Sequence, residues 1–365
     1  MEIEIEGGVI GCVNVPGDIY IYLYIYSSMK VKILDCKKHE HSAGETLEFQ
    51  LAEVDNSFAN GLRRVMLAEV PVLGIESVTI IQNTSVLPDE MIAHRIGLVP
   101  LYSMKARRMQ YARDCLCGGS GCGECQINGE LKVSCPSNKH SLQVFMDSLK
   151  IDDEEVYPVS SEERGVWLLT LGRSQELNLR VVIRKNIAKT HAKFMPVATV
   201  AMRYASDIVL NPDGFAKLDT EHRRQWVERC PRQVFRYDDR TGQVLLADPD
   251  ACIFCRECLL KEPPFNKLAE PLVFVRHKKD KRGYYDFTFT VESTGALPVL
   301  QILYDAVEVL RRKLERVRDG LTEDPNADEM VQTRPIGGAP TAPVVVNEDI
   351  LERDGAEDNL TFVMN

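Results

Sequence analysis

The chain has 365 residues, 44% of them hydrophobic, and a formal net charge of −10. Residues 322–365 hold ten acidic residues and two arginines, so the rest of the chain is close to neutral, which argues against a broad nucleic-acid-binding surface rich in lysine and arginine. No signal-peptide pattern and no apolar run of about eighteen residues occurs, so we expect an intracellular protein without a membrane span.

Residues 1–29 form an N-terminal extension. Within it, residues 19–26 alternate aliphatic residues with tyrosine, which is a strand pattern and too short for a membrane helix. A second interpretation is that Met29 is the natural start, since a conventional strand begins just after it. The sequence leaves both interpretations open.

The next part of the chain mixes strands and helices. Alternation predicts hairpin strands, and an Asp-Asn-Ser cap followed by apolar residues on one helical face predicts a helix that ends at Pro71. The elements expected here are strands at 30–34, 46–54 and 77–83 and helices at 55–71 and 88–96.

A regular apolar seam marks the last predicted helix. After an alternating strand at 287–291 and Gly295, apolar residues recur in steps of four and three, which is typical of a coiled-coil seam. Such a seam packs either on the sheet of its own domain or on a helix of a partner. The seam residues are Leu303, Val307, Leu310, Leu314, Val317 and Leu321. Beyond Gly320, the proline-rich acidic composition predicts a disordered tail.

Four cysteines fall within eleven residues in the first cysteine cluster: Cys115, Cys117, Cys122 and Cys125. Four thiolates at this spacing can enclose Zn²⁺ tetrahedrally, and no coordination position remains for water, so the predicted site is structural. We expect the nearby glycines to supply positive φ angles. These are Gly118, Gly119, Gly121 and Gly123. Cys135 is an alternative ligand.

The second cysteine cluster is Cys252, Cys255 and Cys258, with Cys230-Pro231 upstream as the candidate fourth member. The compact Cys-x-x-Cys-x-x-Cys run with a separate Cys-Pro is typical of ferredoxin-like iron–sulfur sites. A [4Fe–4S] cluster, a zinc ion and an empty motif remain alternatives.

No catalytic motif occurs. The sequence lacks a Walker-type glycine-rich loop, a His-Glu-x-x-His helix and a run of alternating aspartates for catalytic magnesium. We expect His94 to be a hydrogen-bonded structural histidine, because no partner nucleophile or carboxylate pair is evident. The sequence therefore favours a protein that is not an enzyme.

Three motifs carry a family resemblance. The segments 58–71, 83–101 and 289–297 closely resemble the α-like RNA polymerase subunits, a family that contains the third-largest subunit of eukaryotic RNA polymerase II, the archaeal D subunit and the amino-terminal domain of the bacterial α subunit. The resemblance extends from about residue 30 to 320. In this family the first cysteine cluster occupies the position of a zinc loop, here one residue longer between Cys117 and Cys122.

The resemblance implies an α+β fold with a discontinuous dimerisation domain that receives two insertions, an inserted mixed β domain with the zinc loop and a ferredoxin-like insertion. Some archaeal D subunits bind a [4Fe–4S] cluster in the latter. The implied organisation is an extension at 1–29, dimerisation parts at 30–71, 194–206 and 284–321, the zinc-loop domain at 72–193, the ferredoxin-like insertion at 207–283 and an acidic disordered tail at 322–365.

The resemblance also implies a non-catalytic assembly subunit of nuclear RNA polymerase II, located in the nucleus. Its expected partners are a smaller α-like subunit in an obligate heterodimer, the second-largest polymerase subunit and small zinc-binding subunits, with no sequence-specific nucleic acid and no membrane. The implied partner-binding residues are Phe58, Leu62, Arg63, Arg64, Met66, Leu303, Val307, Leu310, Leu314 and Val317.

Three alternatives are weighed against this interpretation. An iron–sulfur electron-transfer protein would need a second redox cofactor or a docking motif, and neither is visible. A zinc-containing nucleic-acid-binding module would need a basic, aromatic-rich patch near the first cluster, where the sequence is glycine-rich and nearly neutral. An α-like subunit of another polymerase class stays open.

Overall fold

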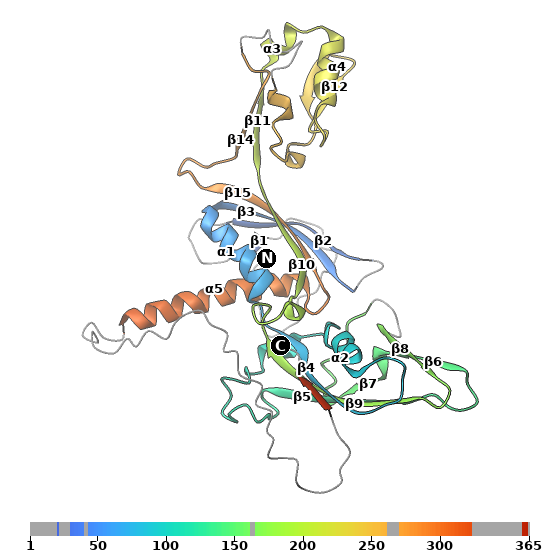
Figure 1. The fold of residues 1–365 in the computed structure, drawn as a ribbon. Coiled ribbons are helices and arrows are strands. Elements are labelled where there is room, and N and C mark those ends of the chain that lie inside the picture. Colours follow the sequence, from blue (N-terminus) through green and yellow to red (C-terminus); the bar gives the residue numbers. More distant parts are fainter. Residues whose placement is uncertain are drawn as a thin grey trace. The chain divides into compact units, whose positions relative to one another are not determined.

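The computed structural model describes residues 20–21, 30–39, 43–160, 165–260, 270–322 and 360–363, and the side chains of all of these except 20–21, 321–322 and 360–363. The fold is α+β, with several small sheets and few helices (Figure 1). The chain divides into two compact units, each built from segments that are distant in sequence. Unit 1 comprises residues 1–67, 197–294 and 298–301, and unit 2 comprises 68–196, 295–297 and 302–365.

Unit 1 contains a five-stranded antiparallel sheet in the order β1-β2-β3-β15-β10. Its strands are β1 (Tyr20–Ile21), β2 (Lys30–Lys38), β3 (Glu45–Val54), β15 (Tyr285–Ser293) and β10 (Val197–Tyr204). The predicted strands are present but longer than expected. Phe49 and Phe289 face each other across β3 and β15, with stacked rings 4.9 Å apart. Alternate residues of each strand therefore form the core face.

Helix α1 (Asn56–Ala68) follows β3 directly. Its start is the predicted cap, because the Ser57 backbone N–H donates to Asp55 Oδ2 over 2.9 Å. The helix ends at Ala68, and Val70 and Pro71 are no longer helical. Ala59, Leu62, Val65 and Met66 are buried along one face.

The segment 206–277 forms a small subdomain with its own core. Strands β10 and β15 lead into the paired strands β11 (Ser206–Leu210) and β14 (Val273–His277), as Figure 1 shows. Between them lie α3 (Pro212–Ala216), α4 (Thr220–Glu228), β12 (Phe235–Asp238), β13 (Gln243–Leu246) and the short 3-10 turns Pro249–Ala251 and Glu257–Leu259. Trp226 lies at the centre, with Phe215 and Phe235 rings within 4.8 Å. This core gives the cysteines of the second cluster a rigid support.

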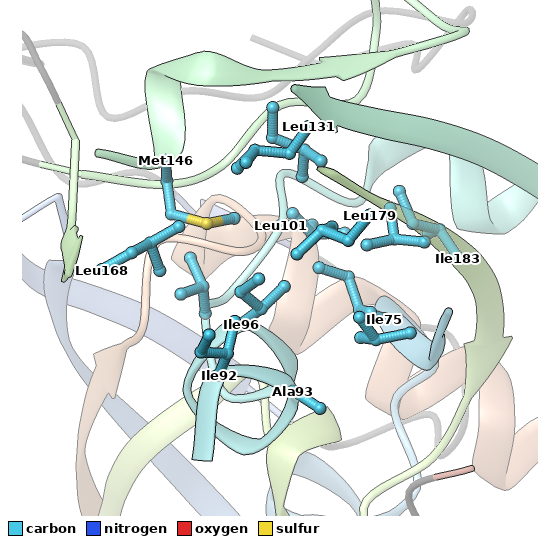
Figure 2. Packing of buried hydrophobic residues seen from close by; sticks show 14 of the residues in the cluster. Ile75, Ile92, Ala93, Ile96, Leu101, Leu131, Met146, Leu168, Leu179 and Ile183 are labelled. Atoms are coloured by element: carbon cyan, nitrogen blue, oxygen red, sulfur yellow. The ribbon is translucent and has the colours of Figure 1, made fainter. Parts of the chain in front are cut away.

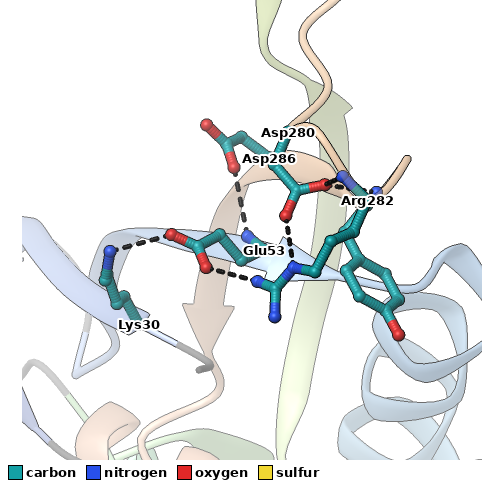
Figure 3. Close-up of polar contacts among 6 residues, drawn as sticks. Lys30, Glu53, Asp280, Arg282 and Asp286 are labelled. Atoms are coloured by element: carbon teal, nitrogen blue, oxygen red, sulfur yellow. Dashed lines mark hydrogen bonds and ion pairs between the residues drawn. The ribbon is translucent and has the colours of Figure 1, made fainter. Parts of the chain in front are cut away.

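An ion-pair network braces the return from this subdomain to the sheet (Figure 3). Glu53 accepts from Lys30 over 2.8 Å and from Arg282 over 2.7 Å, while Arg282 also binds Asp280 over 2.9 Å. The Glu53 backbone N–H donates to Asp286 Oδ1 at 3.1 Å. Glu53 has a positive φ of 60° at a register shift between β3 and β15, and these contacts offset the strain of that conformation.

Unit 2 contains a second sheet in the order β16-β4-β9-β5-β7. Its strands are β4 (Val72–Asn83), β9 (Glu176–Asn186), β5 (Gln126–Ser134), β7 (Leu149–Ile151) and β16 (Leu360–Val363), and β6 (Ser141–Phe145) pairs with β8 (Trp167–Gly172) in a separate ribbon. Gly74 on β4 is required by packing, because a Cβ there would lie 2.6 Å from the Phe194 ring. Because β4 begins at Val72, the strand expected at 77–83 is the second half of a longer strand.

The core of unit 2 lies between this sheet and helix α2 (Asp89–Gly97). Figure 2 shows Ile92, Ala93 and Ile96 of the helix facing Ile75, Leu101, Leu131, Met146, Leu168, Leu179 and Ile183. All of these side chains are buried. Asp89 and Glu90 lie in the first turn of α2, where carboxylates favour the helix dipole. The predicted helix at 88–96 is confirmed.

Helix α5 (Val299–Thr322) contains the predicted seam. The disordered tail expected after it is wrong at one place, since Leu360–Val363 form β16 against β4. Residues 323–359 lie outside the described part of the chain. Among the described residues, no helix combines the length and apolar character needed to span a bilayer.

Candidate metal centres and partner surface

The first cysteine cluster lies in the loop that precedes β5, and its four sulfurs gather in space. The Sγ atoms of Cys115 and Cys122 are 3.5 Å apart, those of Cys117 and Cys125 also 3.5 Å, and those of Cys122 and Cys125 3.8 Å. All four lie within 4.8 Å of one another. Zn–S bonds of about 2.3 Å place tetrahedral sulfurs ~3.8 Å apart, so the donor set fits one zinc ion.

Tight turns hold the segment from Cys115 to Cys125, which we call the metal loop. Backbone hydrogen bonds join Gly118 to Cys115 over 3.1 Å and Cys125 to Cys122 over 3.0 Å. Gly118, Gly119 and Gly121 have φ angles of 64°, 87° and 91°. These three glycines are required where a side chain would strain the backbone. Gly123 was also expected to have a positive φ, and that expectation is wrong.

The loop also favours ionised sulfur at one position. The backbone N–H of Gly121, the thiol of Cys125 and the backbone N–H of Gly119 lower the pKa of the Cys117 thiol to about 6. Zinc binds thiolate rather than thiol, so an ionised Cys117 is the form that a metal requires.

Arg184 of β9 attaches the metal loop to the sheet. Its Nη2 donates to the carbonyl of Gly119 over 3.3 Å and to Gln126 Oε1 over 3.0 Å, and its Nη1 pairs with Glu76 over 2.9 Å. Sequence analysis missed this residue, because an arginine in a strand carries no local signal of what it contacts across the sheet.

Cys135 is not part of the metal loop. Its side chain is 2% exposed and packs in the hydrophobic core of unit 2, with Sγ 3.8 Å from the Pro136 carbonyl oxygen. The alternative in which it replaces a zinc ligand is therefore wrong.

The second cysteine cluster lines one pocket of 460 Å³ in the 206–277 subdomain. Cys230 follows α4, whereas Cys252, Cys255 and Cys258 lie on the loop between β13 and β14. In the described part of the chain, the first cluster is the one group of three or more His, Cys, Asp or Glu side chains whose ligand atoms lie close enough together to share a single metal ion. The second set is therefore more open than a mononuclear zinc site.

The walls of this pocket are cationic. Sequence analysis missed this lining, because three of its residues come from β14 and the loop after it, outside the cysteine motif, and only the fold brings them beside Arg232 and Arg256. The basic lining residues are Arg232, Arg256, Arg276, His277 and Lys279, against the single acid Glu257. A [4Fe–4S] cluster with four thiolates carries a net negative charge, so the lining is electrostatically complementary to it.

Burial raises the pKa of the Cys252 and Cys258 thiols, that of Cys258 to about 11, and the neighbouring cysteines contribute in the same direction. These thiols therefore stay protonated at neutral pH unless a metal centre binds them. Phe254 and Arg256 have positive φ angles of 54° and 66° between the cysteines. Backbone strain of this kind, here at two positions separated by one residue, is typical of a loop that binds a ligand.

Four of the ten predicted partner-binding residues lie in the core. Leu62 and Met66 of α1 and Leu303 and Val307 of α5 are between 0% and 7% exposed, so their prediction as partner-binding residues is corrected: the chain's own packing leaves them no surface to offer. Phe58, Arg63 and Leu310 are half-buried, and Arg64 is exposed. Arg63 donates to Asn60 Oδ1 over 2.9 Å.

The last part of the seam is uncovered. Leu314 is 64% exposed and Val317 is 60% exposed, on the same face of α5. Beside them, Glu69 holds Lys313 and lies 2.9 Å from Lys189, which fixes the helix to the loop after α1. His94 is exposed and has no side-chain hydrogen bond among the described contacts, so the expected structural role is wrong.

Comparison with known proteins decides the family. The model of the RNA polymerase Rpb3/Rpb11 dimerisation domain matches residues 48–314. The chain belongs to this Rpb3/Rpb11 family. Subunit 3 of the DNA-directed RNA polymerases II, IV and V of Arabidopsis thaliana is 39% identical over 301 residues, which cover 79% of this chain and 90% of the relative.

Other relatives of this Rpb3/Rpb11-family chain come from several polymerases. RNA polymerase II subunit rpb3 of Dictyostelium discoideum is 37% identical over 76% of this chain and 92% of its own length. Subunit Rpo3 of the archaeon Archaeoglobus fulgidus is 32% identical over 76% of this chain and 94% of its own length. The resemblance to the third-largest subunit of RNA polymerase II is confirmed.

Proposed function

We propose that this chain is a non-catalytic assembly subunit of nuclear RNA polymerase II, which heterodimerises with a smaller α-like subunit and docks on the second-largest subunit alongside small zinc-binding subunits. The observation that carries the proposal is the match of the dimerisation-domain model from residue 48 to residue 314. The alternative of a free electron carrier is not favoured, because relatives over most of the chain are polymerase subunits.

The exposed end of α5 supports the dimerisation step. Leu314 and Val317 form an apolar strip that water covers in the isolated chain. Burying such a strip against a partner helix removes apolar surface from water, which is the main driving force of association. The seam thus serves both predicted roles, with its first half in the chain's own core and its second half on the partner.

The first cysteine cluster holds a structural zinc ion in this proposal. Sulfur separations of 3.5–3.8 Å among its closest pairs support tetrahedral ligation, and four thiolates close the coordination sphere. Metal analysis of the purified chain tests it. About one zinc per chain is expected, and the Cys122→Ser variant should lose it; unchanged zinc content would exclude Cys122 as a ligand.

The 206–277 pocket holds a [4Fe–4S] cluster in this proposal, ligated by Cys230, Cys252, Cys255 and Cys258. Four cysteines on one pocket, a cationic lining and sulfurs too open for one ion support it. The cluster would brace the subdomain. Its test is reconstitution with iron and sulfide under anaerobic conditions; absence of the broad visible absorption of an iron–sulfur cluster would contradict it.

The polymerase class has one further candidate. The Arabidopsis relative is named as a subunit shared by polymerases II, IV and V. Affinity purification of the tagged chain from nuclei, followed by identification of the largest subunit, separates a polymerase II subunit from one used by several classes.

A further inference from the structure

The sheet of unit 2 ends in a strand from the far end of the chain. Strand β16 runs antiparallel to β4, with Leu360 opposite Ile80 and Val363 opposite Ser77. In the strand order β16-β4-β9-β5-β7, it lies on the outer side of β4 (Figure 1). Without β16, the outer edge of β4 would be free.

A free β4 edge would be a liability. The strand extends over Val72–Asn83, and its inner side is paired with β9 along nearly its whole length. Its outer side would present backbone N–H and C=O groups that can pair with another chain. Val78 and Ile80, opposite β16, are buried and have strong strand propensity, which makes this stretch of edge a good template.

The pairing of β16 is short. It joins four residue pairs, so few hydrogen bonds are available to offset the conformational entropy that is lost when the strand is ordered. Such a strand binds weakly by itself. The covalent connection through 323–359 raises its effective concentration at the edge, which compensates without making the pairing permanent.

The residues next to β16 suit a reversible cap. Asp354, Glu357 and Asp358 lie within the six residues that precede it in the sequence. Acidic residues beside a short apolar strand oppose its pairing with copies of itself, since like charges would be brought together.

We propose that the outer edge of β4 is a strand-docking surface, and that residues 360–363 of the same chain are its resident occupant, which docks reversibly and keeps β4 from pairing with other chains. Docking of residues 360–363 takes place within the folded chain and does not depend on the polymerase partners.

Hydrogen–deuterium exchange on the full chain tests the cap. In a variant that ends at Asn359, the amides among Ser77–Ile80 that face β16 should exchange at least about 10-fold faster, because a cap that is closed most of the time slows exchange by that factor. The alternate amides of this stretch face β9 and should not change. The amides of β5, paired on both sides, should not change. Unchanged exchange at Ser77–Ile80 would overturn the proposal, and so would loss of protection throughout the sheet, because a dispensable cap is not needed for folding.

A full-length variant separates pairing from mere presence of the tail. Replacing Thr361→Pro and Phe362→Pro together removes whichever of two successive N–H groups faces β4, and should act like the truncation. The matched control, Thr361→Val with Phe362→Tyr, keeps both N–H groups and should leave exchange unchanged.

The protective role has its own readout. In sedimentation velocity, the truncated chain should self-associate at lower concentration than the full chain, and a synthetic peptide of residues 358–365 should reverse this and restore protection of Ser77–Ile80. The same peptide with both prolines should do neither. Equal self-association of the two chains would contradict the protective role.

Discussion

Arg184 illustrates how a single side chain can help to gather four cysteine sulfurs without contacting any of them. From β9, its three contacts reach Glu76 on β4, the loop carbonyl of Gly119 and Gln126, the first residue of β5. The guanidinium therefore holds the loop in the turn that gathers the four sulfurs.

Replacing Arg184→Met should lower zinc affinity about 10–100-fold, the usual cost of losing a group that orients metal ligands. Competition with a chromophoric chelator measures this. Arg180→Met, an exposed arginine on the same strand, serves as the control and should bind zinc normally. Equal affinity of both variants would show that the loop is held by its own turns alone.

Glu69 makes stability depend on pH. Burial alone would raise the pKa of this carboxyl, but ion pairs with Lys313 and Lys189 prevail and lower it below 4.5. A depressed carboxyl pKa adds stability that is present above the unfolded value of 4.5 and is lost as pH falls through the folded value.

Glu69→Gln should therefore lower the thermal midpoint of unfolding by about 2–4 °C at pH 6, a loss of roughly 1 kcal/mol. The difference between the two proteins should shrink below pH 4.5, where the wild-type carboxyl takes up its proton. Thermal melts at pH 6 and pH 3.5 check this. A difference that stays constant over that range would show that the two lysines do not stabilise the charged form.

Among the elements, α5 has the clearest division of roles. Its seam is continuous in sequence, yet Leu303 and Val307 are buried whereas Leu314 and Val317 are exposed. The sequence indicated two possible uses for such a seam, packing on the chain's own domain and packing on a partner helix. A helix that extends beyond its own core can serve both.

Leu314→Asp with Val317→Asp should abolish binding of the small α-like partner while leaving the fold intact, because both side chains are already in water in the free chain. Co-purification and circular dichroism measure the two effects. Arg316→Asp makes the same change in net charge at a position about 160° from Leu314 and about 100° from Val317 around the helix, and should bind normally. Intact binding by the double variant would show that α5 does not form the interface.

The two cysteine clusters should respond independently to mutation. Cys255→Ser should remove the visible absorption of the reconstituted iron–sulfur centre and leave the zinc content unchanged, since the two clusters lie in different units. Cys122→Ser should do the reverse. Loss of both metals in either variant would indicate global unfolding rather than two separate sites.

At the scale of the whole molecule, local patterns predicted the elements, but not how distant segments pair. The alternation at 46–54 and 287–291 and the cap at Asp55 gave elements that the structure contains. That β3 pairs with β15, and β4 with β9, depends on contacts across more than a hundred residues, which no local pattern encodes.

The sites show the same limit. The spacing of Cys115 to Cys125 was sufficient to predict that the four sulfurs lie together, because all of them come from one short segment. The cationic lining of the second pocket and β16 were missed, because Arg276 and Leu360 reach their places through the tertiary fold. Burial of Leu62 and Met66 likewise depends on what covers α1, which the family resemblance that implied a partner contact for them did not show.

In the proposed function, this chain assembles a polymerase through its dimerisation domain. Affinity purification of the tagged chain, analysed by native mass spectrometry, tests it most directly. The predicted result is a complex that contains a small α-like subunit and the two largest polymerase subunits, and that loses the small subunit when Leu314 and Val317 are replaced by aspartate. Recovery of a stable, soluble monomer without polymerase subunits would contradict the account.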